Sequence, residues 1–200
     1  MKNFISENFK VIKKLLIYQF GAAFFGILVN SSAGRLPWLN WLTGILAVLF
    51  YIYLLYSAVW EEGARDRIRV DGGRMTRDDL KGLKIALVAN IPNIFIGVVM
   101  VVSTVINVVA SAQWAGNVAA IANAVGVLWE GMYVGIITAI FPQFDYAANT
   151  AIVLSSTQIF LRAVSFVLIV APALISCFAA YKLGYSGVAI IKTSNKNDNK

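Results

Sequence analysis

The stretch "KIALVANIPNIFIGVVMVVSTVINVVA" (residues 84–110) contains no charged residue after its first lysine. A helix needs roughly 20 mostly apolar residues to span the hydrocarbon core of a bilayer, and this stretch is long enough. Similar apolar runs occupy residues 15–33, 38–60 and 158–181. The sequence therefore predicts an all-α fold, a polytopic integral membrane helix bundle.

The composition of the whole chain supports this prediction. Of its 200 residues, 59% are hydrophobic and 14% are charged, whereas soluble domains carry about 25% charged residues. So few charges cannot cover such an apolar chain in water, so we expect the lipid bilayer to be its solvent. The length suits one membrane domain over residues 1–200.

Basic residues predict the orientation, because lysine and arginine concentrate in the cytoplasmic loops of membrane proteins. Lysines precede the first apolar run, six basic residues lie between positions 61 and 81, and four lysines follow Tyr181. The loop at 31–37 carries only Arg35. We therefore expect both termini, the 61–83 segment and the 183–200 tail to be cytoplasmic, in a plasma membrane of bacterial type.

A fifth apolar run, residues 117–141, is less even because Glu130 lies near its middle. Five crossings from a cytoplasmic amino terminus would place the lysine-rich tail outside, against the distribution of basic residues. The sequence thus favours four crossings plus one re-entrant or interfacial segment at 117–141. Five or six crossings are the alternatives.

The densest cluster of charge is "WEEGARDRIRVDGGRMTRDDLKG" (residues 60–82). We interpret residues 61–83 as a charged cytoplasmic loop in which Asp71-Gly72-Gly73 forms a tight turn or a small hairpin. Thr76 is expected to cap a helix that begins near Arg77, with two aspartates in its first turn. Pro92 should then kink that helix.

Several classes of function are excluded or unsupported. The chain has no histidine, which excludes Ser–His and Cys–His catalysis. Cys177 is the only cysteine, so neither a disulfide framework nor a Cys/His metal site is expected. Gly72-Gly73 lacks the spacing of a phosphate-binding loop. The net charge of +7 is attributed to lipid headgroups rather than to nucleic acid. We therefore expect a non-enzymatic protein without cofactor, catalytic residue or metal ligand.

Polar residues inside the apolar runs are the candidate functional residues. An ionisable group at the centre of a membrane helix costs about 2.5–3.5 kcal/mol, and such groups mark functional sites by default. Glu130 is expected to pair with Arg162, the other charge deep in the later runs. The alternative is an interfacial helix in which Glu130 is hydrated and Trp129 lies at the headgroups. Asn90 and Asn93, beside Pro92, could bind backbone groups freed by the kink, or a ligand.

Two functions follow from these features. The first is a component or accessory subunit of a membrane complex that docks a cytosolic partner through the 61–83 segment. Its docking candidates are the five arginines Arg65, Arg67, Arg69, Arg74 and Arg77. The second is a small-solute transporter, or the substrate-binding membrane subunit of one, since broken helices at Pro92 and Pro172 are typical of transporters. Either function allows a membrane partner or a homo-oligomer.

Overall fold

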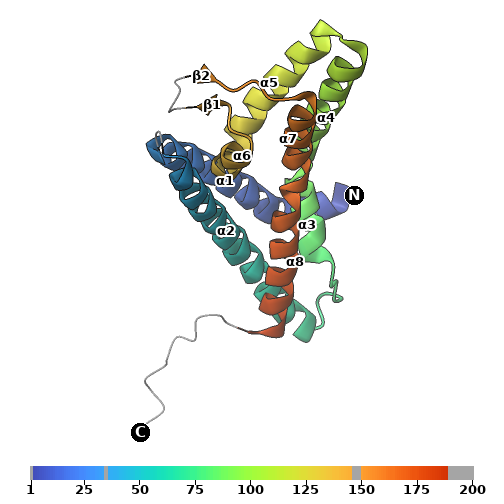
Figure 1. Cartoon of the computed structure of the whole chain (residues 1–200). Coiled ribbons are helices and arrows are strands. Elements are labelled where there is room, and N and C mark those ends of the chain that lie inside the picture. Colours follow the sequence, from blue (N-terminus) through green and yellow to red (C-terminus); the bar gives the residue numbers. More distant parts are fainter. Residues whose placement is uncertain (1, 34–35, 146–149, 189–200) are drawn as a thin grey trace.

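The computed structural model describes residues 2–33, 36–145 and 150–188, and these are almost entirely helical (Figure 1). Arg35, expected outside, and three of the tail lysines, expected in the cytoplasm, lie outside the described residues. The predicted all-α helix bundle is confirmed. Its helices are α1 (Lys2–Ala33), α2 (Pro37–Asp71), α3 (Lys81–Ala89), α4 (Ile91–Ala110), α5 (Gln113–Trp129), the 3₁₀ turn η1 (Gly131–Tyr133), α6 (Val134–Ile140), α7 (Ser156–Leu168) and α8 (Val170–Ser186).

The described chain also contains one short antiparallel pair of strands, β1 (Phe144–Asp145) and β2 (Thr150–Ala151). Phe144 pairs with Ala151. This pair of strands lies in the segment that connects α6 to α7.

Four segments among the described residues are long and apolar enough to cross a membrane: Phe4–Ala33, Trp38–Asp71, Ile91–Ala110 and Ser156–Ser186. The second has 34 residues and measures about 51 Å at 1.5 Å per residue, which exceeds the roughly 30 Å of a hydrocarbon core. Its end therefore extends into the headgroups or beyond. Large apolar side chains face outward, for example Phe20, Phe24 and Phe95, each at least 60% exposed, as expected of a surface covered by lipid.

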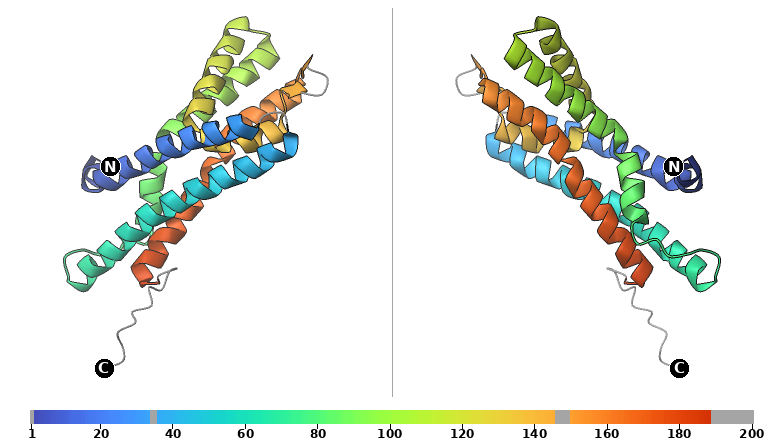
Figure 2. Two further views of the ribbon diagram at one scale, coloured as in Figure 1. Left: turned by 90° about the vertical axis from the view of Figure 1, so that its left-hand side faces the viewer. Right: turned by 90° about the vertical axis from the view of Figure 1, so that its right-hand side faces the viewer.

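Four helix ends meet at one end of the bundle, which we call the charged end. It comprises the first turns of α1, the last turns of α2, the start of α3 and the end of α8 (Figures 1 and 2). Lys14 Nζ on α1 lies 2.9 Å from Glu61 Oε2 on α2. The indole of Trp60 donates to the carbonyl of Val188, beyond α8, at 3.0 Å. Both ends of the described chain therefore lie on the same side of the bundle.

The segment between α4 and α7 begins and ends at the end of the bundle opposite the charged end. Only two residues separate α4 from α5, and the chain bends by 88° between α5 and the η1–α6 segment. The start of α7 then lies beside the end of α4, where Val108 and Phe160 line the same small cavity. Residues 113–155 therefore begin and end on one side. This arrangement gives four candidate spanning segments plus one bent pair that begins and ends on one side, which is consistent with the re-entrant or interfacial segment that the sequence favoured.

Both internal prolines break their helices. A proline lacks the N–H that bonds to residue i−4, and its ring clashes with that residue's carbonyl. Pro92 lies in the first turn of α4, directly after the break at Asn90 between α3 and α4. Pro172 follows the break at Ile169 between α7 and α8. The kink predicted at Pro92 is confirmed.

The charged segment at 61–83 is not a loop over its whole length, because α2 continues to Asp71. Opposite charges three or four residues apart support this extension: Arg65 contacts Glu61, and Arg69 lies 3.1 Å from Asp66. The hairpin interpretation is therefore wrong. The predicted turn is confirmed, since residues 72 and 73 form it and Gly73 has a φ of 68°.

The helix start predicted near Arg77 is also wrong, because α3 begins at Lys81 without a side-chain cap. Asp78 Oδ1 instead accepts the backbone N–H of Leu80 at 3.1 Å, closing a turn before the helix. The aspartates that were expected in a first helical turn make ion pairs with neighbouring cations, Asp78 with Lys84 and Asp79 with Arg77.

Candidate polar sites and cavity

Five charged side chains are buried in the described part of the chain: Glu62, Asp66, Lys81, Glu130 and Arg162. They divide into two groups. The first three contact one another at the charged end. Glu130 and Arg162 lie elsewhere, and neither makes an ion pair with a described residue.

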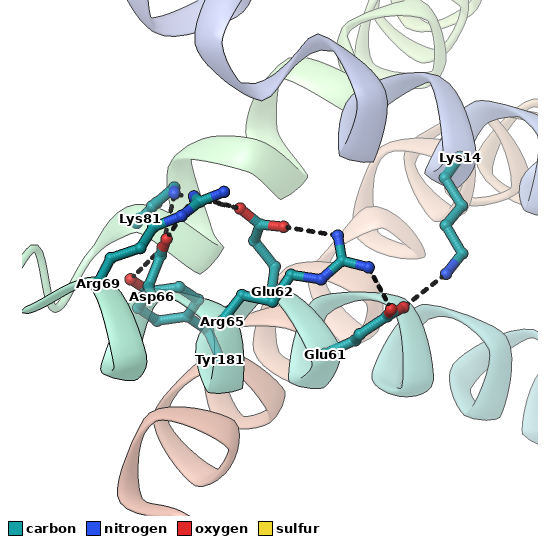
Figure 3. A network of polar contacts seen from close by, with 8 residues as sticks. All are labelled: Lys14, Glu61, Glu62, Arg65, Asp66, Arg69, Lys81 and Tyr181. Atoms are coloured by element: carbon teal, nitrogen blue, oxygen red, sulfur yellow. Dashed lines mark hydrogen bonds and ion pairs between the residues drawn. The ribbon is translucent and has the colours of Figure 1, made fainter. Parts of the chain in front are cut away.

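The network at the charged end joins three helices (Figure 3). Lys81 Nζ of α3 lies 2.6 Å from Asp66 Oδ2 of α2 and 3.4 Å from Glu62 Oε1. The hydroxyl of Tyr181 on α8 donates to Asp66 Oδ2 at 3.0 Å. Arg69 adds a contact of 3.1 Å to Asp66 Oδ1. Because Asp66 is fully buried and has three donors, the network fixes α2, α3 and α8 relative to one another.

Most of the arginines predicted to dock a partner contact acids of their own segment. Arg65 pairs with Glu61, Arg67 lies 3.7 Å from Asp71, and Arg69 joins the network. Arg77 lies 2.6 Å from Asp79 and 4.8 Å from the centre of the Tyr185 ring. The hydrogen bond to Asp79 raises the pKa of Arg77. Only Arg74 is exposed and without a side-chain ion pair or hydrogen bond among the described residues.

A chain of buried amides crosses the middle of the bundle. Asn93 Oδ1 accepts hydrogen bonds from Gln19 of α1 and from the indole of Trp129, the latter at 2.7 Å. Asn93 donates to Asn90 Oδ1 at 3.0 Å, and Asn90 donates to the carbonyl of Ala86 at 2.9 Å. The two predicted asparagines thus satisfy backbone and side-chain groups around the break before Pro92. The sequence reasoning missed Gln19, whose signal is an amide inside an apolar run.

Glu130 lies at the bend of the re-entrant segment, between α5 and η1. Its side chain is fully buried, and neither carboxylate oxygen has a hydrogen-bond partner among the described residues. The hydroxyl of Tyr133 is buried and unpartnered too. The rings of Tyr51 and Tyr133 meet edge to face at 6.1 Å. The expectation of a hydrated Glu130 side chain is therefore wrong.

Close glycine contacts place this bend against α1 and α2. A Cβ on Gly131 would collide with the carbonyl of Ala23 on α1. A Cβ on Gly135 would come within 2.7 Å of the Cα of Gly44 on α2. Only glycine allows such close approach of two backbones. The irregular backbone around Glu130 is therefore enclosed by protein, as non-helical backbone at membrane depth has to be.

Arg162, on α7, borders a cavity of about 400 Å³ at the end opposite the charged end. Its side chain is buried, and its Nε atom has no hydrogen-bond partner in the described part of the chain. The other polar groups that line the cavity are Thr104 and Asn107 of α4, Asn123 of α5, and Gln143 before β1. Small and apolar residues of α4, α5 and α7, together with residues 152–154 between β2 and α7, make up the rest of its described wall.

The predicted Glu130–Arg162 ion pair is wrong. Glu130 lies at a bend that packs against α1 and α2, whereas Arg162 borders a cavity between α4, α5 and α7. The two side chains therefore belong to different sites on either side of the re-entrant segment. Opposite charge alone does not determine which faces of two helices meet.

No group of three or more cysteine, aspartate or glutamate side chains suited to a metal ion occurs within the described ranges. Cys177 is a free, buried cysteine.

A scan against protein-family models, a search of curated proteins and a search of solved structures each found no match to this chain. Function has to be inferred from the chain's own residues.

The contribution of the Asp66–Lys81 ion pair to stability can be tested with the substitution Lys81→Met. This change leaves Asp66 buried without its main counter-charge, so the free energy of unfolding in mild detergent should fall by about 3–5 kcal/mol. The matched control is Lys84→Met, which removes an exposed ion pair to Asp78 and should cost about 0–1 kcal/mol. Adding Asp66→Asn to Lys81→Met should recover part of the loss, because no uncompensated charge then remains. Equal losses for the two lysine variants would contradict the role of the network.

Proposed function

We propose that the chain is a non-enzymatic, solute-binding membrane protein of a transport system, which holds a small polar solute inside the bundle. It acts as a homo-oligomer, because four spanning segments are few for a self-sufficient secondary transporter. The observation that carries the proposal is that two charged side chains, Glu130 and Arg162, are buried without an ion-pair partner among the described residues. Charged groups inside a membrane bundle are costly and mark solute or ion pathways.

Broken helices give the second line of support. Substrate sites in transporters are typically formed where membrane helices are discontinuous, since freed backbone and side-chain groups face a common space there. Here α3 and α4 part at Asn90, α7 and α8 part at Ile169, and the re-entrant segment bends at Glu130. Asn93 and Trp129 link two of these breaks by a hydrogen bond. The polar groups of the interior are therefore gathered at the discontinuities.

Docking of a cytosolic partner is the second candidate function. Its support is Arg74, which is exposed in the turn after α2 and has no side-chain partner among the described residues. The other four arginines contribute less, because each already pairs with an acid. An Arg74→Glu variant should lose proteins that co-purify with the native chain in mild detergent. An unchanged set of co-purifying proteins would remove this candidate.

Transport can be tested in proteoliposomes supplied with radiolabelled acetate, inorganic phosphate, alanine and glycine. Uptake of at least one solute should exceed the uptake by empty liposomes. Arg162→Gln or Glu130→Gln should reduce the initial rate about tenfold or more, the effect of losing roughly 1.4 kcal/mol of interaction.

The matched control is Lys84→Gln at the exposed charged end, which should leave uptake unchanged. Uptake that equals the native rate in both interior variants would contradict the proposal, as would a panel in which no solute enters.

A further inference from the structure

We propose that the cavity beside Arg162 binds a small oxyanion, a carboxylate or a phosphate group carried by a soluble solute or by a lipid headgroup. This inference deepens the proposed function and rests on it, because it names the chemical class that the same cavity accepts. It depends on the charge of Arg162, the lining of the cavity and the position of both in the bundle.

The charge of Arg162 requires a partner that the described chain does not supply. A guanidinium stays protonated in proteins and presents five N–H donors in a planar fork. Arg162 is only 8% exposed, and its Nε atom makes no hydrogen bond. None of the described residues that line the cavity is acidic. Burying an unpaired charge costs several kcal/mol, so an anion bound in the cavity would recover a large part of that cost.

The cavity lining fits an oxyanion better than a simple halide. Carboxylate and phosphate groups accept two parallel N–H bonds from an arginine, which leaves further oxygen lone pairs to be satisfied. Asn107, Asn123 and Gln143 each bring an amide, and Thr104 brings a hydroxyl, to the same cavity. These groups come from three separate parts of the chain. A volume of about 400 Å³ lies within the range of roughly 300–1,000 Å³ that small-molecule sites occupy.

The position of Arg162 also suits an anion that approaches from the headgroup side. It lies six residues after Ser156, the first residue of α7, or about 9 Å along the helix axis. Helices α7 and α8 together form a 31-residue segment about 46 Å long, which exceeds the hydrocarbon core by roughly 8 Å at each end when centred. Arg162 then lies at the boundary between headgroups and hydrocarbon. Soluble anions and lipid phosphates both reach this depth.

The test is thermal unfolding of the purified chain in an uncharged detergent. Sodium phosphate, sodium acetate and phosphatidylglycerol are added separately, with sodium chloride at matched ionic strength as reference. At least one of these probes should raise the unfolding temperature of the native chain by about 2–4 °C. Arg162→Gln should abolish the rise, and Arg162→Lys should reduce it because an ammonium lacks the planar fork.

Two further measurements separate binding from structural damage. The unfolding temperature of Arg162→Gln in chloride should equal or exceed that of the native chain, because a buried unpaired charge has been removed. The Arg74→Gln variant, changed at an exposed position, should show the same rise in unfolding temperature with the probes as the native chain. A rise with phosphatidylglycerol alone assigns the oxyanion to a lipid headgroup, whereas a rise with phosphate or acetate assigns it to a soluble solute.

The inference is overturned if the native chain and Arg162→Gln show equal rises, or if none of the three probes has an effect. Its failure is distinguishable from failure of the proposed function. An Arg162-dependent rise without uptake in proteoliposomes supports the oxyanion site and contradicts transport. Uptake without an Arg162-dependent rise supports transport and contradicts the oxyanion site.

Discussion

The hydrocarbon core of a bilayer offers no hydrogen-bond partners, and the arrangement of this chain follows from that constraint. The long helices satisfy their own backbone groups, so these helices can face lipid. The irregular backbone at the bend of the re-entrant segment is instead enclosed against α1 and α2. Gly131 and Gly135 make this possible, because a Cβ at either position would meet the backbone of a neighbouring helix. A segment that enters and leaves on one side is therefore tolerated only as part of the protein interior.

The same constraint separates two kinds of buried charge. At the charged end, Asp66, Lys81 and Tyr181 satisfy one another and join three helices. These groups hold the helices together, and most charged side chains of the 61–83 segment pair with one another in the same manner. Glu130 and Arg162 are different, since the chain buries both without a partner among the described residues. Polar groups that cost stability and support no contact are the best indicators of ligand binding in this structure.

The spanning segments could be predicted from the sequence, because uninterrupted apolar runs and basic flanks depend on local composition alone. The break in the helix before Pro92 could be predicted in the same way, because proline interrupts helical hydrogen bonding. The extension of α2 to Asp71 could not be predicted, since mixed charges at helical spacing also occur in solvated loops. Contacts such as Lys81 with Asp66, and the absence of one between Glu130 and Arg162, depend on which helix faces meet. Packing across the bundle, including the glycine contacts at the bend, decides which helix faces meet. A single sequence does not reveal this packing.

Labelling of single cysteines distinguishes a segment 113–155 that re-enters the membrane from one that crosses it. Cys177 is buried and would be replaced by alanine. Cysteines would then be introduced at the exposed positions Arg74 and Ser186, at the charged end, and at Ser111 and Val153, on either side of the segment. With a membrane-impermeant maleimide on sealed vesicles of both orientations, positions 111 and 153 should label from one face and positions 74 and 186 from the other. Labelling of positions 111 and 153 from opposite faces would show that the segment crosses the membrane and would contradict the account.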